Sequence, residues 1–488
     1  MRKPVRRYRS IWLGVTVILL TLLGSDSIAG ANHSHAGQLD GTAPWTSFGF
    51  NASHSSFNAA AVSVTPVNAS TLAQAWQFVT PGPTTSGQPG IGFDGSPVVA
   101  DGLVLIGSNT GVFYALNEDS GAVVWSLNAG FIPKFTCGAA GIEATATVAS
   151  DPISGKPTVY FAGANGVLWA VDVASGTVDW SSKIFPTPKS SADFIWGSPT
   201  VFGGRVYIGI ASGCDNPLSR GGVASFSQAT GAHQATFWTV AATAVGGAIW
   251  STPAASSAGV FVTTGNGNQM QPNSQGLSNS IVRLNPTTLK ATAHWTVPGI
   301  ATLDDDFGGS PTLFQATIAG KVTPMVGACN KNGFFYAWSQ SALGKGPIWS
   351  DQLGNPAMQP NNACLATAGW NGADLFITTN SSNISGVTYP AVARELDPAT
   401  GRYLWQSGLS DGPVLGNTAI DGAGVLAAIT YSKTSPATTN KMVLMDQASG
   451  AVVGTYPTTD QSGGGPIWAD GYLFFDGSDG VLHELTTP

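Results

Sequence analysis

A repeated element of about fifty residues constrains the fold of this chain more than any other feature of its sequence. The segment "GSPVVADGLVLIGSNTGVFYALNEDSGAVVW" at residues 95–125 has seven further copies, which begin at residues 145, 197, 251, 309, 366, 412 and 465. Most copies end on a tryptophan, and these tryptophans recur every 49 to 58 residues from Trp76 to Trp405. A chain built this way repeats one supersecondary unit eight times.

Each copy holds four short runs rich in Val, Ile, Thr and aromatic residues, separated by glycine-rich turns. Many copies carry the pattern Asp/Asn-x-x-Ser/Thr-Gly between the third and fourth runs. This pattern predicts a tight hairpin in which the first side chain bonds local backbone and the glycine takes a positive φ. Four strands per copy indicate a propeller blade, and a tryptophan at a fixed place suits the wedge between blades.

The eighth copy lacks its fourth strand, because the chain stops at "LTTP", whereas "LAQAWQF" at 72–78 precedes the first copy as an extra strand. We therefore predict an all-β fold, an eight-bladed propeller of four-stranded antiparallel blades over residues 43–488. In this fold residues 72–78 complete the blade formed by 463–488, so that the N-terminal strand closes the ring.

The N-terminus combines a basic start, "MRKPVRRYRS", with an apolar run of about fourteen residues, which is short for a membrane span. This pattern predicts a signal peptide over residues 1–31 and export to the periplasm, the cell surface or the medium; an uncleaved signal anchor is the alternative. Without it the chain has 15 basic and 26 acidic residues, which disfavours nucleic acid as a partner.

Four cysteines in an exported chain favour disulfides, and no CxxCH haem attachment or zinc pattern is present. All four map to one face of the predicted disc, in two pairs of neighbouring blades. We expect Cys137 to pair with Cys214, and Cys329 with Cys364, because paired Cα atoms must lie within about 7 Å.

One face of the disc, here called the site face, carries the loops that enter the first strand of each blade and the loops that join strands two and three. Trp250 in "GGAIWSTP" and the carboxylates of "DDDFGGSP" precede first strands, and Asn266 and Lys331 follow second strands. Crowded carboxylates resist joint ionisation, so a cation or Lys331 should lie beside them. Solvated turn residues and blade packing are the alternative explanations for this pattern.

The repeat, its eight copies and the opening "PWTSFGFNASHSSFNAA" resemble the pyrroloquinoline quinone (PQQ) dehydrogenase-like propellers. The resemblance implies that Trp250 stacks on the quinone, that Lys331 touches its oxygens, and that Asp304 or Asp306 is the general base. It also implies calcium or a lanthanide as the metal, with Asn266 and Asp304 as ligands. Asp306 resembles a second carboxylate that binds a larger cation in some relatives.

Two features depart from that family. Its pair of adjacent cysteines is absent, and the metal-binding glutamate expected near "ASGCDNPLSRGG" is missing, which leaves Asp215 as a shorter substitute. The resulting hypothesis is an exported quinoprotein that oxidises an alcohol or other hydroxylated compound and, having no haem, uses a separate electron acceptor. The alternative is a non-catalytic propeller that acts as a binding or assembly scaffold for a surface partner through loops such as 266–279 and 379–388.

Overall fold

The computed structural model describes residues 43–82, 92–135, 138–185, 192–268, 275–299, 304–357, 363–431, 440–458 and 463–488. All of them belong to one compact unit, Gly37–Pro488. The segment expected to be a signal peptide, residues 1–31, lies outside the described residues. Within the described part, no helix has the length and apolar character needed to span a bilayer.

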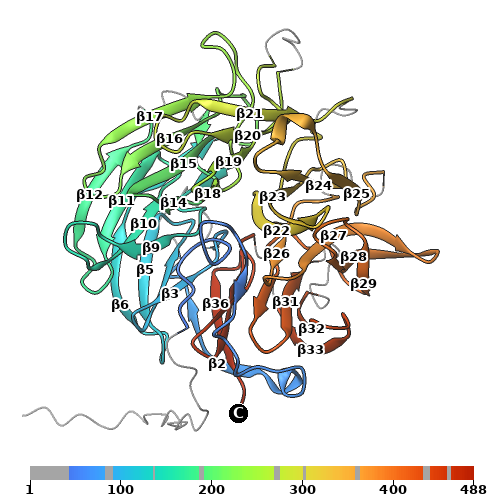
Figure 1. Ribbon diagram of the computed structural model, residues 1–488. Coiled ribbons are helices and arrows are strands. Elements are labelled where there is room, and N and C mark those ends of the chain that lie inside the picture. Colours follow the sequence, from blue (N-terminus) through green and yellow to red (C-terminus); the bar gives the residue numbers. More distant parts are fainter. Residues whose placement is uncertain are drawn as a thin grey trace, which may run out of the picture. The chain divides into compact units, whose positions relative to one another are not determined.

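Eight blades, each with four antiparallel strands, form the fold, as the repeat predicts (Figure 1), and two of these sheets carry one further short strand. The first four blades, from the axis outward, comprise these strands: β3 (Val98–Ala100), β4 (Leu103–Gly107), β5 (Val112–Asn117) and β6 (Val123–Asn128); β9 (Thr147–Ser150), β10 (Pro157–Ala162), β11 (Val167–Asp172) and β12 (Val178–Lys183); β14 (Thr200–Phe202), β15 (Arg205–Ser212), β16 (Gly222–Ser227) and β17 (His233–Trp238); β18 (Ala254–Ser256), β19 (Gly259–Thr263), β20 (Ser280–Leu284) and β21 (Ala291–Thr296).

The remaining blades comprise these strands: β22 (Thr312–Ile318), β23 (Lys321–Cys329), β24 (Phe334–Ser339) and β25 (Trp349–Gln352); β26 (Gly369–Trp370), β27 (Leu375–Ile384), β28 (Val387–Leu396) and β29 (Tyr403–Leu409); β30 (Ala419–Asp421), β31 (Val425–Thr430), β32 (Lys441–Asp446) and β33 (Val452–Pro457); β34 (Ile467–Ala469), β35 (Tyr472–Asp476), β36 (Val481–Thr486) and β2 (Ala73–Val79). Short elements outside the blade pattern are β1 (Phe57–Asn58), β7 (Ile132–Phe135), β8 (Gly138–Ala140), β13 (Asp193–Phe194) and the 3₁₀ turns η1 (Ala69–Thr71) and η3 (Leu343–Lys345).

The ring closes through β2, which pairs antiparallel with β36 from Ala73↔Thr486 to Val79↔Val481. Figure 1 shows these two strands, one blue and one red, side by side. The prediction that residues 72–78 complete the last blade is therefore confirmed. The N-terminal strand thus gives the last blade its fourth strand and links the two ends of the propeller in one sheet.

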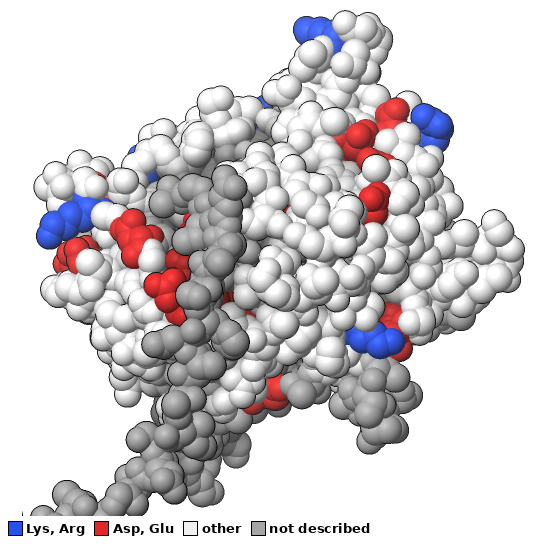
Figure 2. Space-filling model, turned by 90° about the horizontal axis from the view of Figure 1, so that it is seen from below, with Lys and Arg blue, Asp and Glu red and all other residues white. Residues whose placement is uncertain are grey.

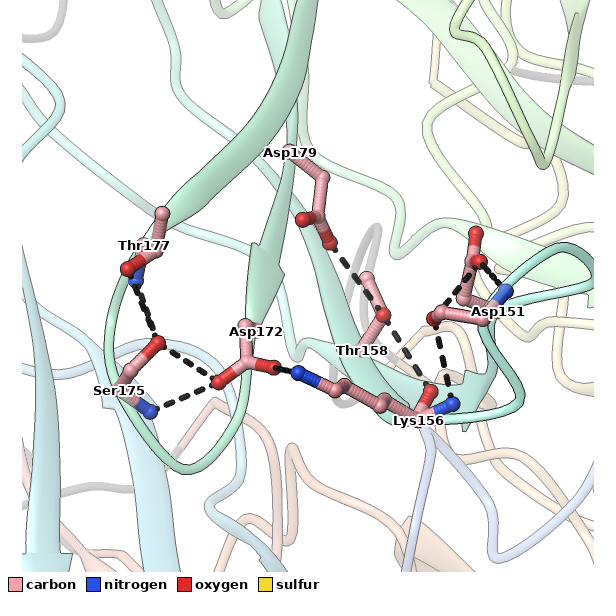
Figure 3. A network of polar contacts seen from close by, with 8 residues as sticks. Asp151, Lys156, Thr158, Asp172, Ser175, Thr177 and Asp179 are labelled. Carbon is pink, nitrogen blue, oxygen red and sulfur yellow. Dashed lines mark hydrogen bonds and ion pairs between the residues drawn. The ribbon is translucent and has the colours of Figure 1, made fainter.

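The Asp-x-x-Ser-Gly turn of the second blade has the predicted geometry (Figure 3). The Oδ1 atom of Asp172 accepts hydrogen bonds from the Ser175 amide at 2.8 Å and the Ser175 hydroxyl at 2.7 Å. Gly176 follows with φ of +70° and donates its amide to the Asp172 carbonyl. The side chain thus satisfies backbone groups that the tight turn would leave unpaired.

The tryptophans join neighbouring blades, as predicted. The indole of Trp125 donates to the Val173 carbonyl of the next blade at 2.8 Å, and its ring lies against Gly176. The same hydrogen bond to the following blade is made by Trp76, Trp180, Trp349 and Trp405. A glycine is required under each ring, because a Cβ atom there would lie within 3 Å of the indole.

Trp238 departs from this pattern. The turn of the next blade has Leu289, with φ of +51°, where the five turns described above have glycine. The Leu289 side chain is buried, and Trp238 is instead 38% exposed and stacks on the Arg220 guanidinium at 4.6 Å. The blade interface next to the candidate site is therefore closed by leucine rather than by tryptophan.

A chain of hydrogen bonds runs around the propeller axis at the start of the first strands. The backbone amide of Ser198 donates to the Thr252 hydroxyl, that of Thr252 to Ser310, that of Ser310 to Thr367, and that of Thr367 to the Asn417 side chain. The donor–acceptor distances are 2.9 to 3.2 Å. These bonds hold the inner ends of adjacent blades, and so position the loops from which the candidate site is built.

Replacing Gly401 with Ala should destabilise the fold by about 2–4 kcal/mol. Its φ is +74°, and a Cβ atom would lie 2.5 Å from the Trp349 ring, so the substitution combines backbone strain with a displaced tryptophan. The matched control is Gly155→Ala, which has φ of +73° and no atom within 4 Å of the added methyl group. Chemical denaturation should show a clearly smaller loss for the control; equal losses would contradict the proposed packing role.

Candidate functional site

The residues singled out from the sequence converge on one cavity on the site face. Trp250 lies in the loop that precedes β18, and Asn266 follows β19. Asp304 and Asp306 precede β22, and Lys331 follows β23. Together with Asp215 they line a cavity of about 450 Å³. The repeat places these loops on one face, because each occupies an equivalent position in its own blade.

Lys331 joins the two carboxylates of the "DDDFGGSP" segment. Its ammonium nitrogen lies 2.7 Å from Asp304 Oδ1 and 2.7 Å from Asp306 Oδ1, and 4.9 Å from the centre of the Trp250 ring. The Lys331 backbone amide also donates to the Asp306 carbonyl at 2.8 Å. This arrangement agrees with the expectation that a cationic group stabilises the crowded carboxylates.

Asn266 contacts the other two acidic positions. Its side-chain amide donates to Asp304 Oδ1 at 2.8 Å and to Asp215 Oδ2 at 3.1 Å. Two carboxylates and one amide group therefore meet at a single point, and rotation of the amide by 180° would present its oxygen there. Such a set of oxygen donors suits a hard cation such as calcium or a lanthanide. Among the described residues, no group of three His, Cys, Asp or Glu side chains is arranged to bind a metal.

The two carboxylates of the ion pair differ in their surroundings. The side chain of Asp304 is 35% exposed, whereas that of Asp306 is 2% exposed and accepts a hydrogen bond from Trp250 Nε1 at 3.1 Å. Burial raises the pKa of Asp306 to about 6, against the opposing effect of Lys331. Burial lowers the pKa of Lys331, but Asp306 and Asp304 outweigh it and hold this pKa above the usual value. The lysine is therefore charged at neutral pH.

Trp250 lines the cavity, in contrast to the tryptophans that lie between blades. It lies half-buried at the wall of the cavity, whereas Trp468, at a similar place in the last repeat, is buried and donates to the Ala419 carbonyl. Trp196 also lines the cavity, and its indole donates to the Ser212 carbonyl at 2.9 Å. The cavity thus offers two aromatic rings to a ligand.

A second cavity of about 480 Å³ contains two acidic residues that the sequence analysis missed, and shares Trp196, Trp250 and Lys331 with the first. These residues are Asp94 and Glu143. The pKa of Glu143 is raised well above its usual value, by burial first and then by the adjacent Asp94. Both could have been found, because "GFDGSP" and "GIEATAT" precede first strands as "DDDFGGSP" does.

The cysteines agree with the predicted pairing as far as the structure describes them. Cys329 and Cys364 form a disulfide across neighbouring blades, and both are buried in one hydrophobic cluster. Cys214 lines the site cavity and is disulfide-bonded. Cys137, its expected partner, lies outside the described residues. A buried disulfide of this kind is typical of proteins from oxidising compartments.

Comparison with protein families identifies the class to which this fold and site belong. Residues 45–350, more than half of the chain, match the PQQ family described as the "Glucose/ethanol/alcohol dehydrogenase, beta-propeller domain". The chain belongs to this family of β-propellers.

Relatives in this family include both enzymes and assembly factors. The chain is 26% identical over 286 residues to the quinohemoprotein alcohol dehydrogenase of Comamonas testosteroni, covering 50% of this chain and 39% of that protein. It is 30% identical over 146 residues to the outer membrane protein assembly factor BamB of Moranella endobia, covering 27% and 30% respectively. The matches therefore span less than half the length of these relatives.

Solved structures support the fold over a larger part of the chain. A europium-containing methanol dehydrogenase superposes with a TM-score of 0.72 at 15% identity, covering 91% of this chain and 98% of that one. At this identity the similarity concerns the fold alone. The activity must be argued from the site.

Proposed function

We propose that this protein is an exported quinone-dependent oxidoreductase that oxidises an alcohol or another hydroxylated compound. The observation that carries the proposal is the Asp304–Lys331 ion pair beside Asn266, at the wall of a cavity that also presents the Trp250 ring. A base, a cation and an aromatic platform are the groups that oxidation of an alcohol by a bound quinone requires. The Cys329–Cys364 disulfide supports export.

The residues of the cavity fit PQQ and a hard cation. Trp250 offers a ring face for stacking, and Lys331 provides donors for quinone oxygens. Asp215, Asn266 and Asp304 would hold calcium or a lanthanide through oxygen atoms. When bound, the quinone would accept a hydride, so that the substrate loses two electrons.

Asp304 is the better placed of the two candidate bases. Its side chain is partly exposed in the cavity, so that a substrate hydroxyl can approach and transfer its proton to the carboxylate. Lys331 contacts the same carboxylate at 2.7 Å and fixes its position in the cavity. Loss of this proton to Asp304, with the hydride accepted by a bound quinone, would convert the hydroxylated carbon to a carbonyl.

The charge of the two cavities makes a cation part of the proposal. Their lining includes Asp94, Asp215, Asp304 and Asp306 against Lys331, without counting Glu143, whose pKa is raised. PQQ carries three carboxylates, and these would be repelled by such a wall. A divalent or trivalent ion at Asp215, Asn266 and Asp304 would offset this charge, so we expect quinone binding to depend on the cation.

A non-catalytic scaffold is the second candidate, and the similarity to BamB over 146 residues favours it. The long hairpin of β27 and β28 would supply a surface for a partner on the site face, with residues 381–388 at its tip. In Figure 2 the visible surface carries few charged residues, which allows contacts with an uncharged partner. A scaffold needs no ion pair inside a cavity, and this is why we place the enzyme first.

Reduction of a dye in the presence of alcohols distinguishes the two. The protein incubated with PQQ and either calcium or a lanthanide should reduce a phenazine dye when a primary or secondary alcohol is added. Omission of the cation should abolish the reaction, and the matched variant Trp250→Ala should need a higher PQQ concentration to reach the same rate. No dye reduction with any alcohol, under either cation, would reject the enzyme and leave the scaffold.

A further inference from the structure

We propose that Asp306 is a positioning residue, which fixes the orientation of the Trp250 ring and of the Lys331 ammonium group, and that it neither takes the substrate proton nor binds the cation. The inference deepens the proposed function and rests on it only for the identity of the ligand that stacks on Trp250. It assigns different tasks to two carboxylates that are two residues apart in the sequence.

Asp306 contacts both partners with different atoms. Its Oδ2 accepts the indole hydrogen of Trp250 at 3.1 Å, and its Oδ1 lies 2.7 Å from the Lys331 ammonium. Its carbonyl also accepts the Lys331 backbone amide. Asp306 thus holds the side chain and the main chain of Lys331, together with the one polar atom of Trp250.

The space around Asp306 is shaped to keep it in place. Gly265 lies beside it, where a Cβ atom would be 3.1 Å from Asp306 Oδ2 and would crowd the carboxylate. The side chain is 2% exposed, against 35% for Asp304, so it is Asp304 that presents its carboxylate to a substrate hydroxyl in the cavity. The side-chain amide of Asn266 contacts Asp215 and Asp304, and no contact joins it to Asp306 among the described residues. The cation position therefore lies on the Asp304 side of Lys331.

The consequence of this arrangement is a fixed platform. An indole held at its nitrogen cannot rotate about its side-chain bonds without breaking a buried hydrogen bond, which would leave a charged oxygen unpaired. Lys331 is held at the same time over the ring, 4.9 Å from its centre. A planar ligand would therefore meet a preorganised aromatic face and a preorganised donor.

The test uses the full chain labelled with 5-fluorotryptophan, whose fluorine resonances report the surroundings of each indole. The Trp250 resonance is identified by its loss in Trp250→Phe. Asp306→Ala should shift this resonance by at least about 0.5 ppm or split it, because the acceptor is lost. Asp306→Asn should restore a single resonance near the wild-type position, since its amide oxygen can accept the indole hydrogen.

The neighbouring Asp305→Asn is the matched control and should leave the Trp250 resonance unchanged. An unchanged resonance in Asp306→Ala, or an Asp306→Asn resonance displaced as far as that of the alanine variant, would overturn the proposal. If the alanine variant does not fold, Asp306→Leu takes its place, because leucine fills the space without an acceptor.

A second measurement separates this inference from the proposed function. In PQQ titrations Asp306→Ala should raise the dissociation constant at least tenfold, and Asp305→Asn should not change it. If the wild-type protein binds no PQQ, the proposed function fails, but the fluorine spectra still decide whether Asp306 positions Trp250. If PQQ binds equally well to Asp306→Ala, the positioning role is rejected and the proposed function stands.

Discussion

Replacement of Asp304 with Asn should lower turnover in the dye-linked assay by at least about a hundredfold and leave the structure intact. Removal of a general base typically costs a factor of 10²–10⁴, and the isosteric amide can still contact Lys331 and Asn266. The measurement is steady-state turnover under saturating alcohol, with PQQ and cation supplied in excess.

Two controls make this result specific to proton transfer. The dissociation constant of PQQ at saturating cation should change much less than turnover, which separates loss of the base from loss of the cofactor. Asp305→Asn should retain wild-type turnover. Activity of the Asp304 variant within a factor of about five of the wild type would show that Asp304 is not the base.

A second large effect is expected from acidic residues that are buried where the ring closes. Glu484 on β36 is fully buried, and neither of its carboxylate oxygens has a hydrogen-bond partner in the described structure. The groups that face it are Glu118, Asp119, Trp76 and Tyr472. Asp470 lies beside Glu118, and its carboxylate accepts the Ala43 amide. No basic side chain contributes to the pKa of Glu118 or Glu484.

These surroundings determine how stability depends on pH. Burial and then the nearby Glu118 raise the pKa of Glu484 to about 9, and burial, Asp470 and Asp119 raise the pKa of Glu118 to about 8. In the unfolded chain both groups release their protons near pH 4.5. Between these values the folded state binds more protons, so the free energy of unfolding must decrease as pH rises.

The free energy of unfolding should therefore fall by several kcal/mol between pH 5 and pH 9, since each pKa unit corresponds to about 1.4 kcal/mol. Glu484→Gln should match the wild type at pH 5, where the glutamate is protonated, and should be the more stable protein at pH 9. Urea denaturation across this range measures the effect, with the exposed Asp101→Asn as control. A Glu484→Gln variant that loses as much stability as the wild type between pH 5 and pH 9 would contradict the account.

The repeat made most of the fold predictable. The period of the repeat determines the blades, and local patterns such as Asp172-x-x-Ser175-Gly176 determine their turns, because these interactions are made within a few residues. The closing strand could be predicted because one copy is a strand short. The parallel pairing of β1 with β30 could not, since residues 57–58 match no part of the repeat and their partner is about 360 residues away.

The candidate site was predictable as a group of residues but not as a set of contacts. Equivalent positions in the repeat place Trp250, Asn266, Asp304 and Lys331 on one face, and the structure brings them together. Which carboxylate is buried depends on the path of one irregular loop, where residues two apart can point in different directions. Asp306 is fixed by Trp250 of another blade, a contact that no local pattern encodes.

Titration of the protein with PQQ, followed by quenching of tryptophan fluorescence, tests the central claim most directly. With saturating calcium or a lanthanide, quenching should saturate at micromolar quinone, and without the cation it should require at least tenfold more. Trp250→Ala should weaken binding by about 1–3 kcal/mol, if stacking contributes here as in other aromatic platforms. The absence of saturable quenching with either cation would contradict the assignment of this cavity as a quinone site.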